Sequence, residues 1–382
     1  MDSVTTQFFE FGDAAQPFAL SGGGSLSRVR LAYEQYGEMN ADRSNVILLF
    51  HALTGSQHAA GTNVSVDGVE ALWTEECHAG WWDDFVGSGK ALNTDKFCVI
   101  CVNCLGGCYG STGPSSINPE TGKPYGGSFP RVSFIDIVRS QAVLLDHLGV
   151  DCLHACVGAS VGGMMTLTFS VMFPERVKVV MPLCTGMRIQ SLARIHNYEQ
   201  AHAIEMDPLF NSGDYYDGAH PDEGLALARV IAHKTYVSLS MMEQRARGEI
   251  ETRSGLSFYR FTHPVESYMK HQGQKFVQRF DANTYLRILD AWQTYDLLEA
   301  SGCDTHEEAF ARCAHQRFMV FSVDSDVSFY PVEQYRLVQT LKTAEVPVRY
   351  VTIHSDKGHD AFLLEPELFT PHLAYSLENA WE

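Results

Sequence analysis

Five short apolar runs constrain the fold of this chain more than any other feature of its sequence. They are continuous, without polar alternation, and they occupy residues 46–50, 97–102, 152–157, 177–183 and 318–323. Such runs are typical of strands that are covered on both faces, as in a parallel sheet. Helical patterns over residues 134–148, 162–173 and 332–341 fall among them. This alternation predicts an α/β fold with a mostly parallel, doubly wound sheet and right-handed crossovers.

Two parts of the chain depart from this alternation. The first 45 residues hold short alternating stretches joined by Gly22–Gly24, which predict antiparallel strands and turns. Residues 187–301 are rich in Met, His, Tyr and Arg, and helical runs cover 225–238 and 285–298. We interpret them as a helical cap inserted into a core made of residues 1–186 and 302–382. Because ligands bind outside the carboxyl ends of the strands in open α/β sheets, this cap would cover the site.

Composition and charge exclude several classes of function. A length of 382 residues accommodates a core domain and an insert. The formal net charge of −18 argues against a nucleic-acid partner, because no excess of Lys or Arg is present to neutralise phosphates. Residues 1–12 lack the pattern of a secretory signal, and no apolar stretch has the length of a membrane span. We therefore expect a cytoplasmic protein that does not associate with membranes.

Four of the ten cysteines cluster at Cys98, Cys101, Cys104 and Cys108. Thiolates at such spacing can converge on one metal ion, but no second pair with zinc-site spacing accompanies them. Cys98 and Cys101 fall in an apolar run that predicts a buried strand, where small cysteines are ordinary. We favour this second interpretation and expect no metal, and ten cysteines in so long a chain fit a reducing compartment.

The segment from Val157 to Gly163 carries the strongest indication of chemistry. It reads Val-Gly-Ala-Ser-Val-Gly-Gly, follows an apolar run and opens a helical pattern. This is the G-x-S-x-G motif in the strand–turn–helix context of a nucleophile elbow, with Ser160 as the nucleophile. Glycines are needed there because bulky residues would collide with the adjacent strand and helix. The motif alone also occurs by chance in ordinary turns, and its position between strand and helix favours the functional interpretation.

A serine needs a base and a carboxylate that orients this base, and proteins with this elbow order them Ser, Asp or Glu, His. Among sixteen histidines, His359 stands out because it follows the strand-like residues 348–354 near the C-terminus. The acid should follow the run 318–323, where Asp324 and Asp326 are both candidates. Singly, each of these residues reads as a loop or turn residue. As an ordered set at three successive strand ends, they predict a catalytic triad.

The same chemistry requires two donors for the tetrahedral oxyanion. One is the backbone N–H after the nucleophile, which belongs to Val161. The other should come from the loop after the first apolar run, His51-Ala-Leu-Thr-Gly55, where we expect Leu53 to contribute. Losing one such donor typically lowers the rate about a hundred- to a thousandfold.

Several long motifs resemble the homoserine O-acetyltransferase family, which has the α/β-hydrolase fold. They cover most of the chain in order and lie at residues 51–55, 80–83, 103–116, 118–126, 173–177, 280–285 and 358–365. The resemblance implies that an acyl group passes from acetyl-CoA, the donor, to the enzyme serine and then to an amino-acid hydroxyl. It also implies no permanently bound cofactor, and a homodimer.

Site residues follow from this resemblance one by one. It implies Ser160 as nucleophile, His359 as base and Asp326 as acid, although this segment is one residue longer than usual and Asp324 stays a candidate. It implies contacts of Asp360 with the acceptor amine and of Tyr236 with the substrate. The family's arginine for the acceptor carboxylate corresponds to Ala201 here, which cannot replace a guanidinium. Arg194, on the same helical face, is our candidate substitute.

The resulting hypothesis is ping-pong transfer of an acetyl group to L-homoserine, in methionine and cysteine biosynthesis. The Ala201 departure leaves serine or another alcohol open as acceptor, and a succinyl donor also stays open. An esterase of the same fold is the first alternative, because the same triad serves hydrolysis. A catalytically silent scaffold is the second, and the complete Ser–Asp–His set argues against it.

Overall fold

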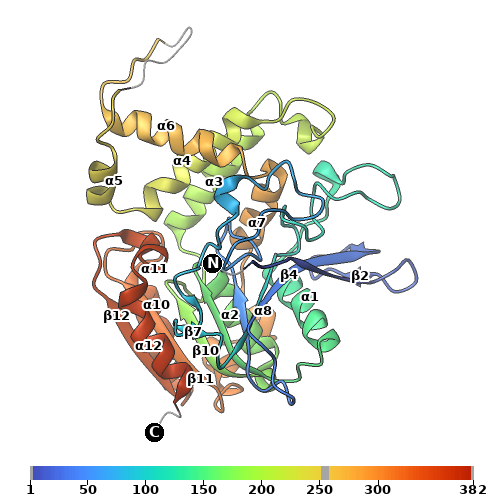
Figure 1. The fold of residues 1–382 in the computed structure, drawn as a ribbon, viewed down its shortest axis with the longest axis vertical. Coiled ribbons are helices and arrows are strands. Elements are labelled where there is room, and N and C mark those ends of the chain that lie inside the picture. The colour runs from blue at the N-terminus through green and yellow to red at the C-terminus, as the bar shows by residue number, and fades with distance from the viewer. Residues whose placement is uncertain (1–2, 251–257, 380–382) are drawn as a thin grey trace.

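An eight-stranded mixed sheet forms the centre of the molecule (Figure 1) in the computed structural model, which describes residues 3–250 and 258–379. Its strand order is β1-β4-β8-β5-β9-β10-β11-β12. The pairs β1–β4 and β4–β8 are antiparallel, and every later pair is parallel. The strands are β1 (Gln7–Phe11), β4 (Val29–Tyr36), β5 (Val46–Phe50), β8 (Cys98–Val102), β9 (Leu153–Ala159), β10 (Val177–Leu183), β11 (Arg317–Val323) and β12 (Val348–Ile353). The α/β fold class expected from the apolar runs is confirmed.

Burial on both faces explains why these runs lack polar alternation. In β5, Leu48 and Phe50 belong to one hydrophobic core, whereas Ile47 and Leu49 belong to a second core. Side chains of a strand alternate between the faces of a sheet, so the two cores lie on opposite sides. All five residues of β5 are buried. A strand with two covered faces therefore needs apolar residues at every position.

Helices from the whole chain cover the sheet. They are α1 (Phe134–His147), α2 (Val161–Met172), α8 (Leu297–Ser301), α9 (His306–Ala311), α10 (Pro331–Thr343), α11 (Ala361–Leu364) and α12 (Pro366–Glu378). Residues of α1, α2 and α10 contribute to the first core, and residues of α12 to the second. Two small ladders, β2 (Phe18–Ala19) with β3 (Ser25–Leu26) and β6 (Val86–Gly87) with β7 (Leu92–Asn93), complete the strands. Among the described residues, no helix is long and apolar enough to cross a membrane.

Between β10 and β11 the chain forms five further helices, which make a layer at one end of the sheet (Figure 1). These are α3 (Ser191–Glu205), α4 (Asp222–Tyr236), α5 (Leu239–Arg245), α6 (Pro264–Val277) and α7 (Ala282–Gln293). The helix predicted over 285–298 was wrong at its end, because Asp296 accepts N–H groups of the next turn and starts α8 as a separate helix. The boundaries of core and cap at residues 187 and 301 stay a prediction.

Candidate active site

Ser160 occupies a strained turn between β9 and α2. Its backbone has φ 60° and ψ −128°, a conformation that costs free energy in a residue other than glycine. The chain passes here between close neighbours, because a Cβ at Gly158 would lie 2.3 Å from the Gly162 carbonyl oxygen, and one at Gly162 would lie 2.4 Å from the Phe50 carbonyl oxygen. The Ser160 N–H donates to Leu183 in β10, at 3.0 Å. The strand, the turn and the helix together have the geometry of a nucleophile elbow.

His359 and Asp326 form a buried pair. The His359 Nδ1 lies 2.7 Å from Asp326 Oδ2, and the other carboxylate oxygen accepts the backbone N–H groups of Ser328 and Phe329, each at 2.8 Å. Burial by itself lowers the pKa of His359, but the charge and hydrogen bond of Asp326 outweigh burial and raise this pKa above 6.5. Within the described residues, the buried His359 Nε2 has no hydrogen-bond partner. The imidazole is thus fixed at Nδ1 and available at Nε2.

Asp324 lies elsewhere. Its carboxylate accepts from the exposed side chain of His354, at 2.8 Å from Nδ1, and from the Ser355 N–H. Of the two aspartates that the sequence offered, the structure brings Asp326 to His359. Ser325, between them, accepts the Gly358 N–H and so links the acid loop to the histidine loop.

The loop after β5 is held by a neutral histidine. His51 is buried, and burial lowers its pKa to about 4. Its Nε2 accepts the Cys104 N–H at 3.1 Å, so its protonated Nδ1 donates to the Ala52 carbonyl at 2.8 Å. The Gly55 N–H donates to the same carbonyl. Because the peptide is trans, the Leu53 N–H points away from this fixed carbonyl.

One cavity of about 170 Å³ brings most of the predicted residues together. Ser160, His359 and Leu53 lie on its wall, and Val161, the first residue of α2, follows Ser160. A helix N-terminus leaves N–H groups without intrahelical partners, which suits a developing negative charge. The roles of Leu53 and Val161 as oxyanion donors stay predictions.

Residues 187–301 supply the opposite wall, with Arg229 and Tyr236 from α4, Trp292 from α7, and Arg279 from the turn before it. The Arg229 guanidinium lies 5.4 Å from the ring centroid of Tyr236. Asp360, next to the base, also lines the cavity. Burial raises the pKa of Asp360, while His359 and Arg229 oppose this rise. Cationic and anionic groups therefore face the same space as Ser160.

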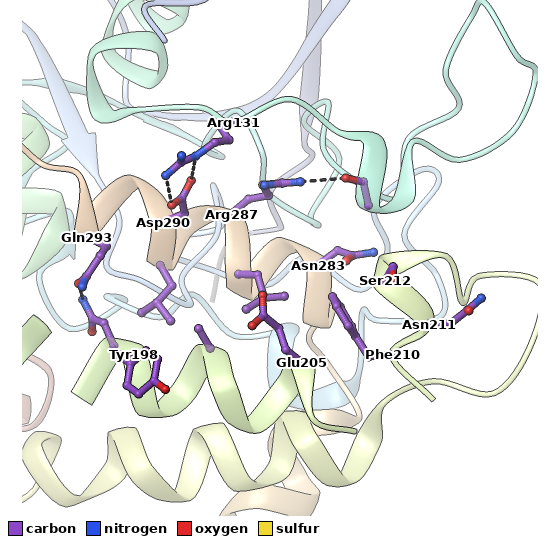
Figure 2. Close-up of a pocket in the computed structure, with 15 residues that line it drawn as sticks. Arg131, Tyr198, Glu205, Phe210, Asn211, Ser212, Asn283, Arg287, Asp290 and Gln293 are labelled. Atoms are coloured by element: carbon purple, nitrogen blue, oxygen red, sulfur yellow. Dashed lines mark hydrogen bonds and ion pairs between the residues drawn. The ribbon is translucent and has the colours of Figure 1, made fainter. Parts of the chain in front are cut away.

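Two residues that the sequence singled out for the acceptor carboxylate lie elsewhere. Arg194 donates to the Gln293 carbonyl at 2.9 Å and is not part of the wall of this cavity. Ala201 lies on another cavity, between α3 and α7, which Figure 2 shows. Sequence reasoning missed Arg229, although a signal was present: it lies two helical turns before Tyr236, and hence on the same face of α4.

The four clustered cysteines are buried and unpaired. Burial raises the thiol pKa of Cys98 and of Cys104 to about 12, so both are protonated at neutral pH. Cys98 and Cys101 lie in β8, as the apolar run predicted. Residues 3–250 and 258–379 contain no group of three His, Cys, Asp or Glu that could hold a metal ion.

Comparisons with known proteins agree with this architecture. The model of the α/β-hydrolase fold family matches residues 45–366. The homoserine O-acetyltransferase of Solidesulfovibrio magneticus is 42% identical over 381 residues, which cover 99% of this chain and 93% of that protein. The enzyme of the same name from Haemophilus influenzae is 40% identical over 355 residues, covering 93% and 94%.

Solved structures include both transferases and esterases. The homoserine O-acetyltransferase from Bacillus anthracis is similar with a TM-score of 0.87 and 26% identity, and all of both chains is covered. Esterase E22 is similar with a TM-score of 0.86 and 27% identity, covering 98% of this chain and 100% of its own. The same fold thus supports both acyl transfer and hydrolysis, so the two reactions have to be distinguished by the residues that line the cavity.

Proposed function

This chain belongs to the homoserine O-acetyltransferase family of α/β-hydrolase-fold enzymes and is an O-acyltransferase, and from this premise we propose its reaction. It moves an acetyl group from acetyl-CoA to the hydroxyl of L-homoserine, through an acetyl-enzyme on Ser160. One observation carries the proposal: Ser160 and His359, whose Nδ1 is paired with the buried Asp326, line a small cavity together with Arg229 and Asp360. The serine, the histidine and its aspartate provide the chemistry of acyl transfer. Arg229 and Asp360 have the charges that bind the carboxylate and the ammonium group of an amino acid.

In the first half-reaction, His359 Nε2 takes the Ser160 proton as the oxygen attacks the thioester carbonyl. The oxyanion accepts the N–H groups of Leu53 and Val161. As the C–S bond breaks, the proton passes from His359 to the leaving thiolate, and free coenzyme A departs. Asp326 stays ionised and stabilises the imidazolium that forms between these steps.

In the second half-reaction, His359 takes the proton of the acceptor hydroxyl. The acceptor oxygen attacks the acetyl-enzyme carbonyl, the bond to Ser160 breaks, and the proton returns to the Ser160 oxygen. The kinetics are therefore ping-pong. Coenzyme A and O-acetylhomoserine are the products, which suits a place in methionine and cysteine biosynthesis.

Arg229 replaces Arg194 as our proposed partner of the acceptor carboxylate. A guanidinium can bind a carboxylate with two parallel hydrogen bonds. Asp360 accepts a hydrogen bond from the ammonium group of the acceptor, and Tyr236, with its ring 5.4 Å from the Arg229 guanidinium, lines the same cavity. An esterase has no need of this pair of opposite charges, so the cavity favours transfer to an amino acid over hydrolysis. Serine as acceptor and succinyl-CoA as donor are the closest alternatives.

Mass spectrometry of the intact protein tests the proposal. Acetyl-CoA alone should add one acetyl group to Ser160, and L-homoserine should then remove it as O-acetylhomoserine. Parallel reactions with L-serine, with water alone and with succinyl-CoA separate the alternatives. Transfer to homoserine without an acetyl adduct would argue for direct transfer, and equal loss to water would argue for an esterase.

A cytoplasmic homodimer completes the proposal. Leu192, Ile195 and Met206 are exposed by 40%, 53% and 67% along one side of α3, where a second copy can cover them. Sedimentation equilibrium measures the mass in solution. A monomer at micromolar concentration would contradict this part alone.

A further inference from the structure

A second cavity, of about 740 Å³, lies between α3 and α7 (Figure 2). It shares no lining residue with the cavity of Ser160. Its volume is in the range of small-molecule sites, about 300–1,000 Å³. Nothing in the proposed reaction uses it.

One wall of this cavity carries an excess of positive charge. Arg131 binds both carboxylate oxygens of Asp290, at 2.7 and 2.6 Å. Arg287, one turn from Asp290 on α7, donates to the Gly127 carbonyl at 3.0 Å. In the described part of the chain, no carboxylate lies within ion-pair distance of Arg287. Burial lowers the pKa of Arg287, and the nearby charge of Arg131 lowers it further, whereas the charge of Asp290 opposes this.

The opposite wall, formed by α3, offers acceptors. Glu205 projects toward the cavity in Figure 2, and no described cation lies within ion-pair distance of it. Asn197 is 1% exposed, and its Oδ1 has no hydrogen-bond partner among the residues described. Its Nδ2 is already used, because it donates to Gln293 at 3.2 Å. A buried acceptor without a donor is a costly feature.

Ala201 keeps the space between these walls open. It lies one turn before Glu205, so an arginine at this position would reach the Glu205 carboxylate and occupy the cavity. With alanine there, the surface between the charged groups is apolar and includes Leu286 and Leu289.

We infer that this cavity binds an α-amino acid with an apolar side chain. The ligand carboxylate binds Arg287, the ammonium donates to Glu205, and the side chain lies against Leu286 and Leu289. Arg287 and Glu205, which have no described ion-pair partner, thereby each gain a partner of opposite charge.

The site also has a physical connection to the base. Gln293 lines the second cavity, and the preceding residue, Trp292, lines the cavity of Ser160. The Trp292 ring stacks on Phe329, with centroids 5.6 Å apart, and Phe329 stacks on His359 at 5.3 Å. A ligand that fixes α7 therefore acts on the surroundings of His359. This regulatory role rests on the proposed function, whereas the binding itself does not.

Titration calorimetry of the full chain with L-norleucine tests the binding. Norleucine has no hydroxyl and cannot accept an acetyl group. Pentylamine and hexanoate each keep its apolar chain and only one of its charged groups. With L-homoserine present at a concentration that fills the acceptor site beside Ser160, we expect saturable binding of one norleucine per chain, and at least about tenfold weaker binding of either half-ligand. The absence of norleucine binding at millimolar concentration would overturn the inference.

Two variants locate the ligand. Ala201→Arg and Arg287→Met should each weaken norleucine binding at least about tenfold and leave acetyl transfer within about twofold. Arg229→Met, in the cavity of Ser160, is the matched control and should leave norleucine binding unchanged. The reverse pattern, with loss only in Arg229→Met, would place the ligand at Ser160 and refute the inference.

Kinetics test the connection. Norleucine should change kcat at saturating homoserine, and Ala201→Arg should abolish this effect. Binding without any change in kcat would refute the regulatory role. Because calorimetry needs no turnover, a failure of the proposed reaction is distinguishable from a failure of the site.

Discussion

Replacing Arg229 by methionine is the most direct test of the proposed acceptor site. The guanidinium lies over Tyr236 and Phe276, at 5.4 and 5.0 Å from the ring centroids. Methionine keeps an unbranched side chain against these rings and removes the charge and the donors. The variant therefore separates recognition of a carboxylate from packing of α4.

The expected magnitude follows from the bonds that are lost. A hydrogen bond to a charged group contributes about 1.5–3 kcal/mol, so kcat/KM for homoserine should fall about 10- to 150-fold. The acetylation of Ser160 involves no acceptor carboxylate, and its rate should change less than about threefold. The loss should therefore lie in the second half-reaction alone.

Stopped-flow acetylation and steady-state transfer measure the two halves separately. Arg194→Met is the matched control, because the Arg194 side chain donates to a backbone carbonyl, has no ion-pair partner among the described residues, and lies outside the cavity. It should retain transfer within about twofold. If Arg229→Met keeps the wild-type kcat/KM, or if Arg194→Met loses it, the assignment of the clamp to Arg229 is refuted.

Three further outcomes are expected. Asp326→Asn should lower kcat about 10³- to 10⁴-fold and Asp324→Asn less than about threefold, measured by acetyl transfer; similar losses in both would contradict the placement of the acid. Activity requires neutral His359, whose pKa is raised, so kcat/KM should fall as pH drops through a value above 6.5, and Asp326→Asn should move this limb to lower pH. Gly162→Ala should destabilise the fold by about 1–3 kcal/mol in denaturant titrations, because its Cβ meets a backbone carbonyl of β5, whereas Gly22→Ala has open space and should be neutral.

The sheet and the elbow were predictable because local sequence determines them. Residues 46–50 had to be apolar at every position for a strand between two cores, and the observed β5 has the same bounds. The glycines around Ser160 report steric contacts that a Cβ would violate, and such contacts leave a signature in the sequence. His359 and the loop that carries its acid were predictable because they follow the last two predicted strands, in the order that this fold requires.

Groups that act across the cavity were not predictable in the same way. Only its helical spacing to Tyr236 separates Arg229 from a surface arginine in the sequence, and its place on the cavity wall depends on how the inserted helices pack over Ser160. The choice between Asp324 and Asp326 required the hydrogen bonds that pair the first with His354 and the second with His359. The helix predicted over 285–298 extended too far because the apolar pattern continues past Gln293, where α7 ends, into a separate helix that Asp296 caps.

The cavity combines residues of the sheet region, which lie before and after the inserted helices in the sequence, with residues of those helices, and this arrangement has an evolutionary consequence. The sheet region carries the serine in its strained turn and the buried acid, so most substitutions there reduce activity or stability. The inserted helices contribute Arg229 and Trp292 without sharing those constraints. Related enzymes can therefore differ in the acceptor that they bind through substitutions in the inserted helices, while the residues that form the acyl-enzyme stay the same.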